Sequence, residues 1–262
     1  MPPPTNALKA RLGDGPPMLC LWLGLANAYV AELSGRAGFD CVVVDGEHGP
    51  NDIPTITAQL QVLAGTGTPA AVRLPVGEPW LIKQALDAGA QTLIIPMVET
   101  AEEAARLVAA TRYPPAGIRG VGAALGRASD WGRIGDYLTT AEREICLLLQ
   151  IESAAALDQI EAIAAVDGVD GLFVGPSDLA ASMGHLGNPG AAEVGAAIED
   201  ALRRIGATGK AAAIFASDPE MAAGAMRLGA RLVAVGADAT LYARAAQDLY
   251  RQAAAARDAM GD

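Results

Sequence analysis

The chain has few of the residues that build redox, membrane or nucleic-acid sites. It contains three cysteines, two histidines and 4% aromatic residues in 262 positions. Cys20, Cys41 and Cys146 are odd in number, far apart, and each lies in an apolar run. We therefore expect reduced core residues in them, and neither a disulfide framework nor a zinc site. No apolar run approaches the ~20 residues that a membrane-spanning helix needs.

Basic residues are also scarce, with 19 lysines and arginines against 30 acidic residues and a net charge of −11. Nucleic acids and anionic membranes bind basic surfaces, so we expect neither as a partner. The first residues contain no basic segment followed by an apolar stretch, which predicts a cytoplasmic protein without a secretory signal. Of the three lysines, Lys83 falls in a predicted helix and Lys210 precedes a predicted strand, so neither suits a Schiff-base mechanism.

What the chain does contain is a repeated pattern of short apolar runs separated by alanine- and leucine-rich helical segments. Such runs are typical of parallel strands that are buried on both faces and joined by helices. They predict strands at 18–24, 41–46, 70–75, 92–98, 145–152, 171–176, 211–217 and 232–238. Eight strand–helix units predict one (β/α)8 barrel domain over residues 1–262. A doubly wound sheet is the alternative, but no G-x-G-x-x-G motif follows the first strand.

One connection, from Tyr113 to Glu144, is much longer than the others. Long connections in compact domains are often lids or binding loops. Its glycines and its arginines, Arg119, Arg127 and Arg133, suit a segment that folds over an anionic ligand. A surface excursion or an oligomer contact accounts for its length equally well.

Active sites of such barrels form at the C-terminal ends of the strands. Glu152 and Asp178 follow neighbouring strands, and two carboxylates without a cysteine favour Mg²⁺ or Mn²⁺ completed by water and substrate oxygens. Helix capping is the alternative for both residues. His48 beside Asp45 fits a base that a carboxylate orients, or a structural histidine. Arg73 ends an apolar strand and indicates a bound anion.

Six stretches, in the same order along the chain, together resemble the HpcH/HpaI aldolases. These are the metal-dependent class II pyruvate aldolases of the phosphoenolpyruvate/pyruvate barrel superfamily. The stretches run from about Met18 to Ala246 and read "VVVDGEHGPND", "QALDAGAQTLIIPMVETAEEA", "RYPPAGIRGVG", "LLLQIES" with "GVDGLFVGPSDLAASMG", and "GARLVAVGADATLYARAA". The resemblance implies a TIM barrel whose last helix is exchanged between subunits, and a homo-hexamer built as a trimer of dimers.

The resemblance also implies roles for single residues. Glu152 and Asp178 would bind a divalent metal (Mg²⁺, Mn²⁺ or Co²⁺), His48 would be the acid/base group and Arg73 would contact the oxo acid. The remaining implied site residues are Asp45 as support for His48, Asp87 across a subunit interface, Gln150 near the metal and substrate, and the main chain of Gly175, Pro176 and Ser177 at the substrate carboxylate.

The implied reaction is reversible cleavage of a 4-hydroxy-2-oxo acid to pyruvate or hydroxypyruvate and an aldehyde, through an enolate that the metal stabilises. This places the chain in aromatic or sugar-acid catabolism. Citryl or malyl thioester lyases and phosphoenolpyruvate mutases share the fold, and a non-catalytic oxo-acid-binding protein is a third hypothesis. Phe215 and His185 depart from the family pattern, which bears on the aldehyde and not on the chemistry.

Overall fold

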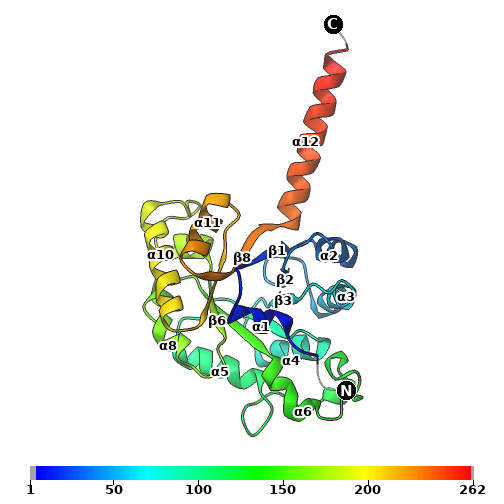
Figure 1. The fold of residues 1–262 in the computed structure, drawn as a ribbon, viewed down its shortest axis with the longest axis vertical. Coiled ribbons are helices and arrows are strands. Elements are labelled where there is room, and N and C mark those ends of the chain that lie inside the picture. Colours follow the sequence, from blue (N-terminus) through cyan, green and yellow to red (C-terminus); the bar gives the residue numbers. More distant parts are fainter. Residues whose placement is uncertain (1–3, 261–262) are drawn as a thin grey trace.

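Eight parallel strands form a closed barrel in the computed structural model, which describes residues 4–260 (Figure 1). The strands are β1 (Met18–Leu23), β2 (Cys41–Asp45), β3 (Ala70–Arg73), β4 (Thr92–Ile95), β5 (Cys146–Ile151), β6 (Gly171–Val174), β7 (Ala211–Phe215) and β8 (Ala230–Ala237). Each strand pairs with the next one in the chain, and β8 pairs with β1. The predicted barrel and all eight predicted strands are confirmed.

Helices return the chain from the C-terminal end of each strand to the N-terminal end of the next. They are α2 (Ala28–Gly35), α3 (Ile53–Leu63), α4 (Pro79–Ala88), α5 (Ala101–Thr111), α7 (Ala154–Leu157), α8 (Ile160–Ala164), α9 (Pro176–Ser182), α10 (Ala192–Ala207) and α11 (Pro219–Arg227). Polar side chains begin several of them: Asp52 accepts the Thr55 N–H of α3, and Asp218 accepts two N–H groups of α11.

Two apolar layers hold the barrel together. Side chains of alternate strand positions fill its interior, and the other positions pack against the surrounding helices. A short N-terminal helix, α1 (Ala7–Leu12), inserts buried Leu8 and Leu12 into the interior cluster. The N-terminal end of the barrel is thereby closed, whereas the ends of the strands that carry the predicted site remain polar.

The expectation of three free cysteines is wrong. Cys20 and Cys41 are partners in the β1–β2 register, with Cα atoms 4.8 Å apart, and they form a disulfide. Both side chains point into the barrel, which places the two sulfur atoms side by side. Cys146 is free and buried.

The long connection lies at the N-terminal end of the barrel, opposite the predicted site. It contains the short helices η1 (Ala123–Leu125), η2 (Arg127–Ser129), α6 (Tyr137–Thr140) and η3 (Ala141–Glu144). Helix α5 runs from the C-terminal to the N-terminal end of the barrel, so a segment that follows it starts there. The prediction of a lid over the chain's own site is therefore wrong.

The last helix, α12 (Asp238–Asp258), stands away from the barrel (Figure 1). Asp238 anchors its start by accepting the N–H groups of Gly24 and Leu25. Its apolar side chains Leu241, Tyr242, Leu249 and Tyr250 are all at least half exposed. The helix therefore has an apolar surface that its own barrel leaves uncovered.

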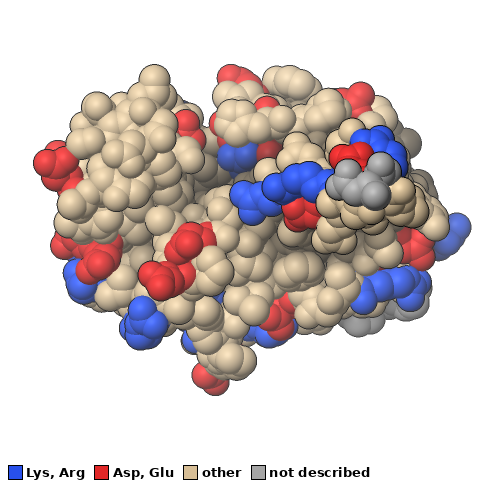
Figure 2. Space-filling view, turned by 90° about the horizontal axis from the view of Figure 1, so that it is seen from above, with Lys and Arg blue, Asp and Glu red and all other residues tan. Residues whose placement is uncertain are grey.

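The surface agrees with the charge of the sequence. Figure 2 shows basic and acidic side chains scattered among uncharged ones on the face seen from above, without a continuous basic area. Within residues 4–260, every helix is too short or too polar to cross a membrane.

Candidate active site

The polar residues predicted for the site gather where β2, β3, β5 and β6 end. Asp45 is the last residue of β2 and Arg73 the last of β3, and the two are partners in the strand register. Gln150 lies in β5, Glu152 follows it, and Asp178 lies in the first turn of α9 after β6. Asp45, Arg73, Gln150 and Glu152 are buried in spite of their polar side chains. Several buried polar side chains in one place indicate a functional site.

Asp45 and Arg73 form a two-bond ion pair. The Arg73 Nε and Nη2 atoms each donate to one Asp45 carboxylate oxygen at 2.8 Å. Burial opposes ionisation of Asp45, but the hydrogen bonds and charge of Arg73 outweigh it and lower the pKa of Asp45. The pair is thus charged, and the arginine plane is fixed.

The loop between β2 and α3 is fixed around Asp45. One carboxylate oxygen accepts the N–H groups of Glu47 (3.0 Å) and His48 (3.4 Å). Asn51 donates to the Asp45 carbonyl at 2.7 Å and itself accepts from buried Gln59. Asp45 therefore supports His48 through the main chain, and the His48 side chain is exposed.

Glu47 has a clear contact that the sequence did not indicate. Its carboxylate lies 2.6 Å from Arg73 Nη1. Burial raises the pKa of Glu47, and the nearby carboxylates of Asp45 and Asp178 add to this, against the attraction of Arg73 and His48. Arg73 is thus held between two carboxylates, of which Asp45 is the strong partner.

Glu152 is held by donors on both oxygens. The main-chain N–H of Met97 donates to Oε1 at 2.6 Å, and Met97 adopts a left-handed conformation with φ of 57°. The Gln150 side-chain amide donates to Oε2. Gly175 leaves room for this arrangement, because a Cβ there would lie 2.6 Å from Oε2. Neither Met97 nor the need for glycine at 175 could be read from the pattern of strands.

The carboxylates of Glu47 and Asp178 are close enough to Glu152 to affect its ionisation. Burial raises the pKa of Glu152 to about 7, and the charges of Glu47 and Asp178 contribute. Ion–ion repulsion of this kind is relieved by a bound cation. Glu152 and Asp178 offer hard oxygen donors, and Gln150 Oε1 is buried without a partner among residues 4–260. The donor set fits Mg²⁺ or Mn²⁺, with water and substrate oxygens in the other positions.

The turn into α9 offers fewer main-chain donors than the sequence suggested. Pro176 has no N–H, and the N–H of Gly175 donates to the Ile151 carbonyl. Ser177 is exposed in the first turn of α9, where N–H groups lack partners within the helix. Of the three predicted residues, Ser177 is the one that can bind a carboxylate through its main chain.

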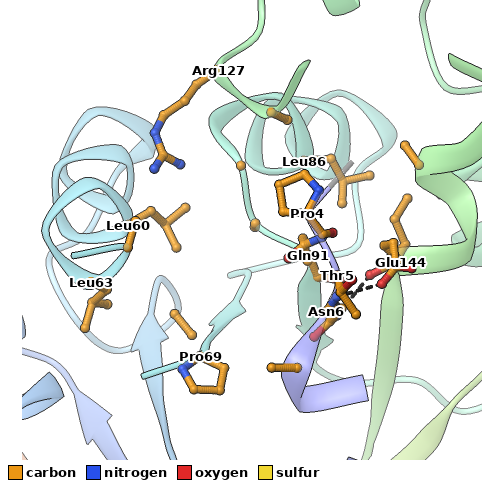
Figure 3. A pocket seen from close by; sticks show the side chains of 18 of the residues that line it. Pro4, Thr5, Asn6, Leu60, Leu63, Pro69, Leu86, Gln91, Arg127 and Glu144 are labelled. Carbon is orange, nitrogen blue, oxygen red and sulfur yellow. Dashed lines mark hydrogen bonds between the residues drawn. The ribbon is translucent and has the colours of Figure 1, made fainter. Parts of the chain in front are cut away.

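Asp87 lies at the other end of the barrel. It is near the C-terminus of α4, and its carboxylate accepts a 2.6 Å hydrogen bond from buried Arg119 of the long connection. A cavity of about 560 Å³ lies at this end, between α3, α4 and the connection (Figure 3). Figure 3 shows Arg127 extending into it, and Arg127 donates to the Ala88 carbonyl at 3.2 Å. The structure therefore does not bring Asp87 together with the other predicted site residues of its own chain.

The three lysines lie away from the strand ends that carry the site. Lys9 and Lys210 donate to the carbonyls of Ile145 and Val169, each next to the start of a strand. Lys83 lies against Gly120 of the long connection. Schiff-base chemistry thus has no lysine at this site.

The sequence profile of the HpcH/HpaI aldolase/citrate lyase family matches residues 18–245. The chain belongs to this family. A hydroxypyruvate/pyruvate aldolase of Deinococcus radiodurans is 55% identical over 94% of this chain and 89% of its own. A 4-hydroxy-2-oxo-heptane-1,7-dioate aldolase of Klebsiella pneumoniae subsp. pneumoniae is 53% identical over 93% and 92%. The crystal structure of an HpcH/HpaI family protein from Burkholderia cenocepacia J2315 has a TM-score of 0.91, is 43% identical, and covers 95% of this chain and 99% of its own.

Proposed function

We propose that the protein is a class II pyruvate aldolase, a carbon–carbon lyase that cleaves 4-hydroxy-2-oxo acids to pyruvate or hydroxypyruvate and an aldehyde. The observation that carries this is the fixed Asp45–Arg73 pair beside buried Glu152 at one end of the barrel. A guanidinium and a metal-binding carboxylate in one place suit a substrate with neighbouring carboxylate and ketone oxygens. Relatives with these activities are 53% and 55% identical to the chain.

Arg73 and His48 carry the two opposite tasks of the reaction. Arg73 keeps N–H donors that Asp45 and Glu47 do not use, and these bind the oxygen that becomes negative when the enolate forms. His48, through a water molecule, takes the proton of the C4 hydroxyl as the C3–C4 bond breaks. The bonding electrons pass to the pyruvate part, and a proton at C3 completes pyruvate. Ser177 and Gln150 orient the substrate.

Glu152 and Asp178 would hold the divalent metal. When bound, the metal would supply Lewis-acid polarisation of the ketone. The Met97 N–H and the Gln150 amide keep Glu152 in one orientation, so the Glu152 carboxylate needs no rearrangement to bind a metal ion. We propose Mg²⁺, Mn²⁺ or Co²⁺ as the ion, since its partners are carboxylate oxygens.

We further propose that the protein acts as a homo-oligomer, a hexamer built as a trimer of dimers. The uncovered apolar side of α12 would pack on a second barrel, where Leu19 of β1 and Tyr29 and Leu33 of α2 are exposed. Asp87, remote from the site of its own chain, would then complete the site of another copy. Removal of residues 241–262 should prevent formation of the hexamer in analytical ultracentrifugation, and Asp87→Asn should lower kcat without altering assembly.

We propose a cytoplasmic location, and the Cys20–Cys41 disulfide is the feature that challenges it. Structural disulfides are rare in reducing compartments.

A thioester lyase needs a basic groove for coenzyme phosphates, which the scattered charges do not favour (Figure 2). The observations therefore favour the aldolase over that alternative.

An aldehyde panel tests the proposal. Purified protein is incubated with pyruvate or hydroxypyruvate and aldehydes of increasing size, with EDTA or with added Mn²⁺, Mg²⁺ or Co²⁺. We expect aldol products in the presence of metal and none in EDTA. His48→Ala and Arg73→Ala should each lower kcat by about 10²–10⁴-fold. Full activity in EDTA would overturn the metal assignment.

A further inference from the structure

Trp22 is a site residue that the sequence did not single out. It lies in β1 and points into the barrel, with 6% of its surface exposed. The Arg73 Cζ atom lies 4.8 Å from the centre of the Trp22 ring, within the range of a cation–π contact. The Trp22 side chain is also one of the groups that lower the pKa of Asp45, after Arg73 and the Glu47 N–H.

The Arg73 guanidinium is therefore held on three sides. Asp45 takes the Nε and Nη2 side, Glu47 takes Nη1, and Trp22 covers one face of the plane. A guanidinium has five N–H donors; Asp45 takes two of them, and Nη1 lies at ion-pair distance from Glu47 without a hydrogen bond of good geometry. The remaining N–H donors are available to a ligand.

Filling the core does not explain the choice of tryptophan. The ring packs against Phe173 at 5.5 Å and edge-on against Phe215 at 5.6 Å. These contacts fix the Trp22 ring, and other large apolar side chains could also fill the volume. An aliphatic side chain has neither the electron-rich face below Arg73 nor an N–H group beside Asp45.

We propose that Trp22 is a positioning residue that holds Arg73 in the orientation in which it binds the 2-oxo acid. The inference rests on the proposed function, because it assigns remaining donors of Arg73 to the substrate. The ring contacts of Trp22 are with Arg73, Phe173 and Phe215, so its role concerns oxo-acid binding and not metal binding.

The test compares Trp22→Phe and Trp22→Leu with the wild-type protein loaded with Mn²⁺. Phe keeps an aromatic face and loses the N–H, whereas Leu keeps apolar volume and loses both. Trp131→Leu is the matched control, because it removes an exposed tryptophan stacked with Arg133 (5.8 Å) in the long connection, far from the site. Isothermal titration calorimetry gives Kd for pyruvate and, separately, for Mn²⁺, and kinetics give KM and kcat.

We expect Trp22→Leu to weaken pyruvate binding about tenfold and to leave Mn²⁺ binding unchanged, with Trp22→Phe in between and Trp131→Leu unaltered. Wild-type pyruvate affinity in Trp22→Leu would overturn the inference, and so would an equal loss of Mn²⁺ affinity, which indicates general damage to the core. Wild-type protein that binds no pyruvate at all would refute the proposed function itself.

A second measurement covers the case in which Trp22→Leu does not fold. In the Trp80→Phe, Trp131→Phe double variant, Trp22 is the only tryptophan, and both replaced residues are exposed. Saturating pyruvate should change its fluorescence, because the ligand binds the arginine that stacks on the ring. Unchanged emission under conditions in which calorimetry shows binding would overturn the inference.

Discussion

Replacing Gly175 with alanine tests the geometry of Glu152 most sharply. The added Cβ would lie 2.6 Å from Glu152 Oε2 and 3.0 Å from Glu152 Cβ, where ordinary contacts begin at 3.4 Å. Glu152 cannot turn away at no cost, because the Met97 N–H and the Gln150 amide hold its two oxygens. Relief of the overlap therefore moves the carboxylate or the start of α9.

Two effects of Gly175→Ala can be estimated. Overpacking of a well-filled site costs roughly 1–3 kcal/mol of unfolding free energy. Displacement of a metal ligand or its support lowers metal affinity by about 10–100-fold. Kd for Mn²⁺ is measured by calorimetry on chelator-treated protein, and kcat is measured at saturating Mn²⁺. We expect weaker binding and a lower kcat.

Gly195→Ala is the matched control for this substitution. Gly195 lies in α10, and a Cβ there would meet nothing within 4 Å. Alanine in a helix should raise the unfolding free energy by roughly 0.5–1 kcal/mol and leave Mn²⁺ binding unchanged. If Gly175→Ala bound Mn²⁺ as tightly as the wild type, Glu152 would not be a ligand in the orientation described.

Three further predictions use other parts of the structure. Burial raises the pKa of Glu152 to about 7, so a proton competes with Mn²⁺ for its carboxylate. The Kd for Mn²⁺ should therefore rise by up to about tenfold for each pH unit as the pH falls from 7 to 5. A constant Kd would contradict this. Alkylation of denatured, unreduced protein should label Cys146 alone, and reduction should cost about 3 kcal/mol of stability for the 21-residue separation; three labelled cysteines would refute the disulfide. Phe215→Leu should raise kcat/KM for bulky aldehydes about tenfold relative to glycolaldehyde. An unchanged ratio would contradict this and place Phe215 outside the aldehyde pocket.

The sequence predicted the barrel because eight buried parallel strands produce eight separate apolar runs. It also predicted which residues follow the strands, and therefore which end of the barrel carries the chemistry. It could not predict strand register, which depends on packing between strands. Register makes Asp45 a neighbour of Arg73, and Cys20 a neighbour of Cys41. Both pairs were missed for this one reason.

The long connection was misplaced for a different reason. Its length and its arginines suggested a lid, but α5 delivers it to the N-terminal end of the barrel, where Arg119 binds Asp87. The alternation of strand and helix alone would have indicated this position. The contact of Met97 with Glu152, in contrast, could not have been predicted. It depends on a left-handed main-chain conformation at a non-glycine residue, which the sequence does not indicate.

Exchange of the C3 protons of pyruvate with deuterated water tests the central claim most directly. Nuclear magnetic resonance follows loss of the methyl signal with wild-type protein, with His48→Ala and with Arg73→Ala, each with Mn²⁺ or with EDTA. An enzyme that forms the enolate at this site should exchange the protons only with metal, and Arg73→Ala should slow the exchange by orders of magnitude. Tight pyruvate binding without exchange would contradict the account and leave a protein that only binds oxo acids.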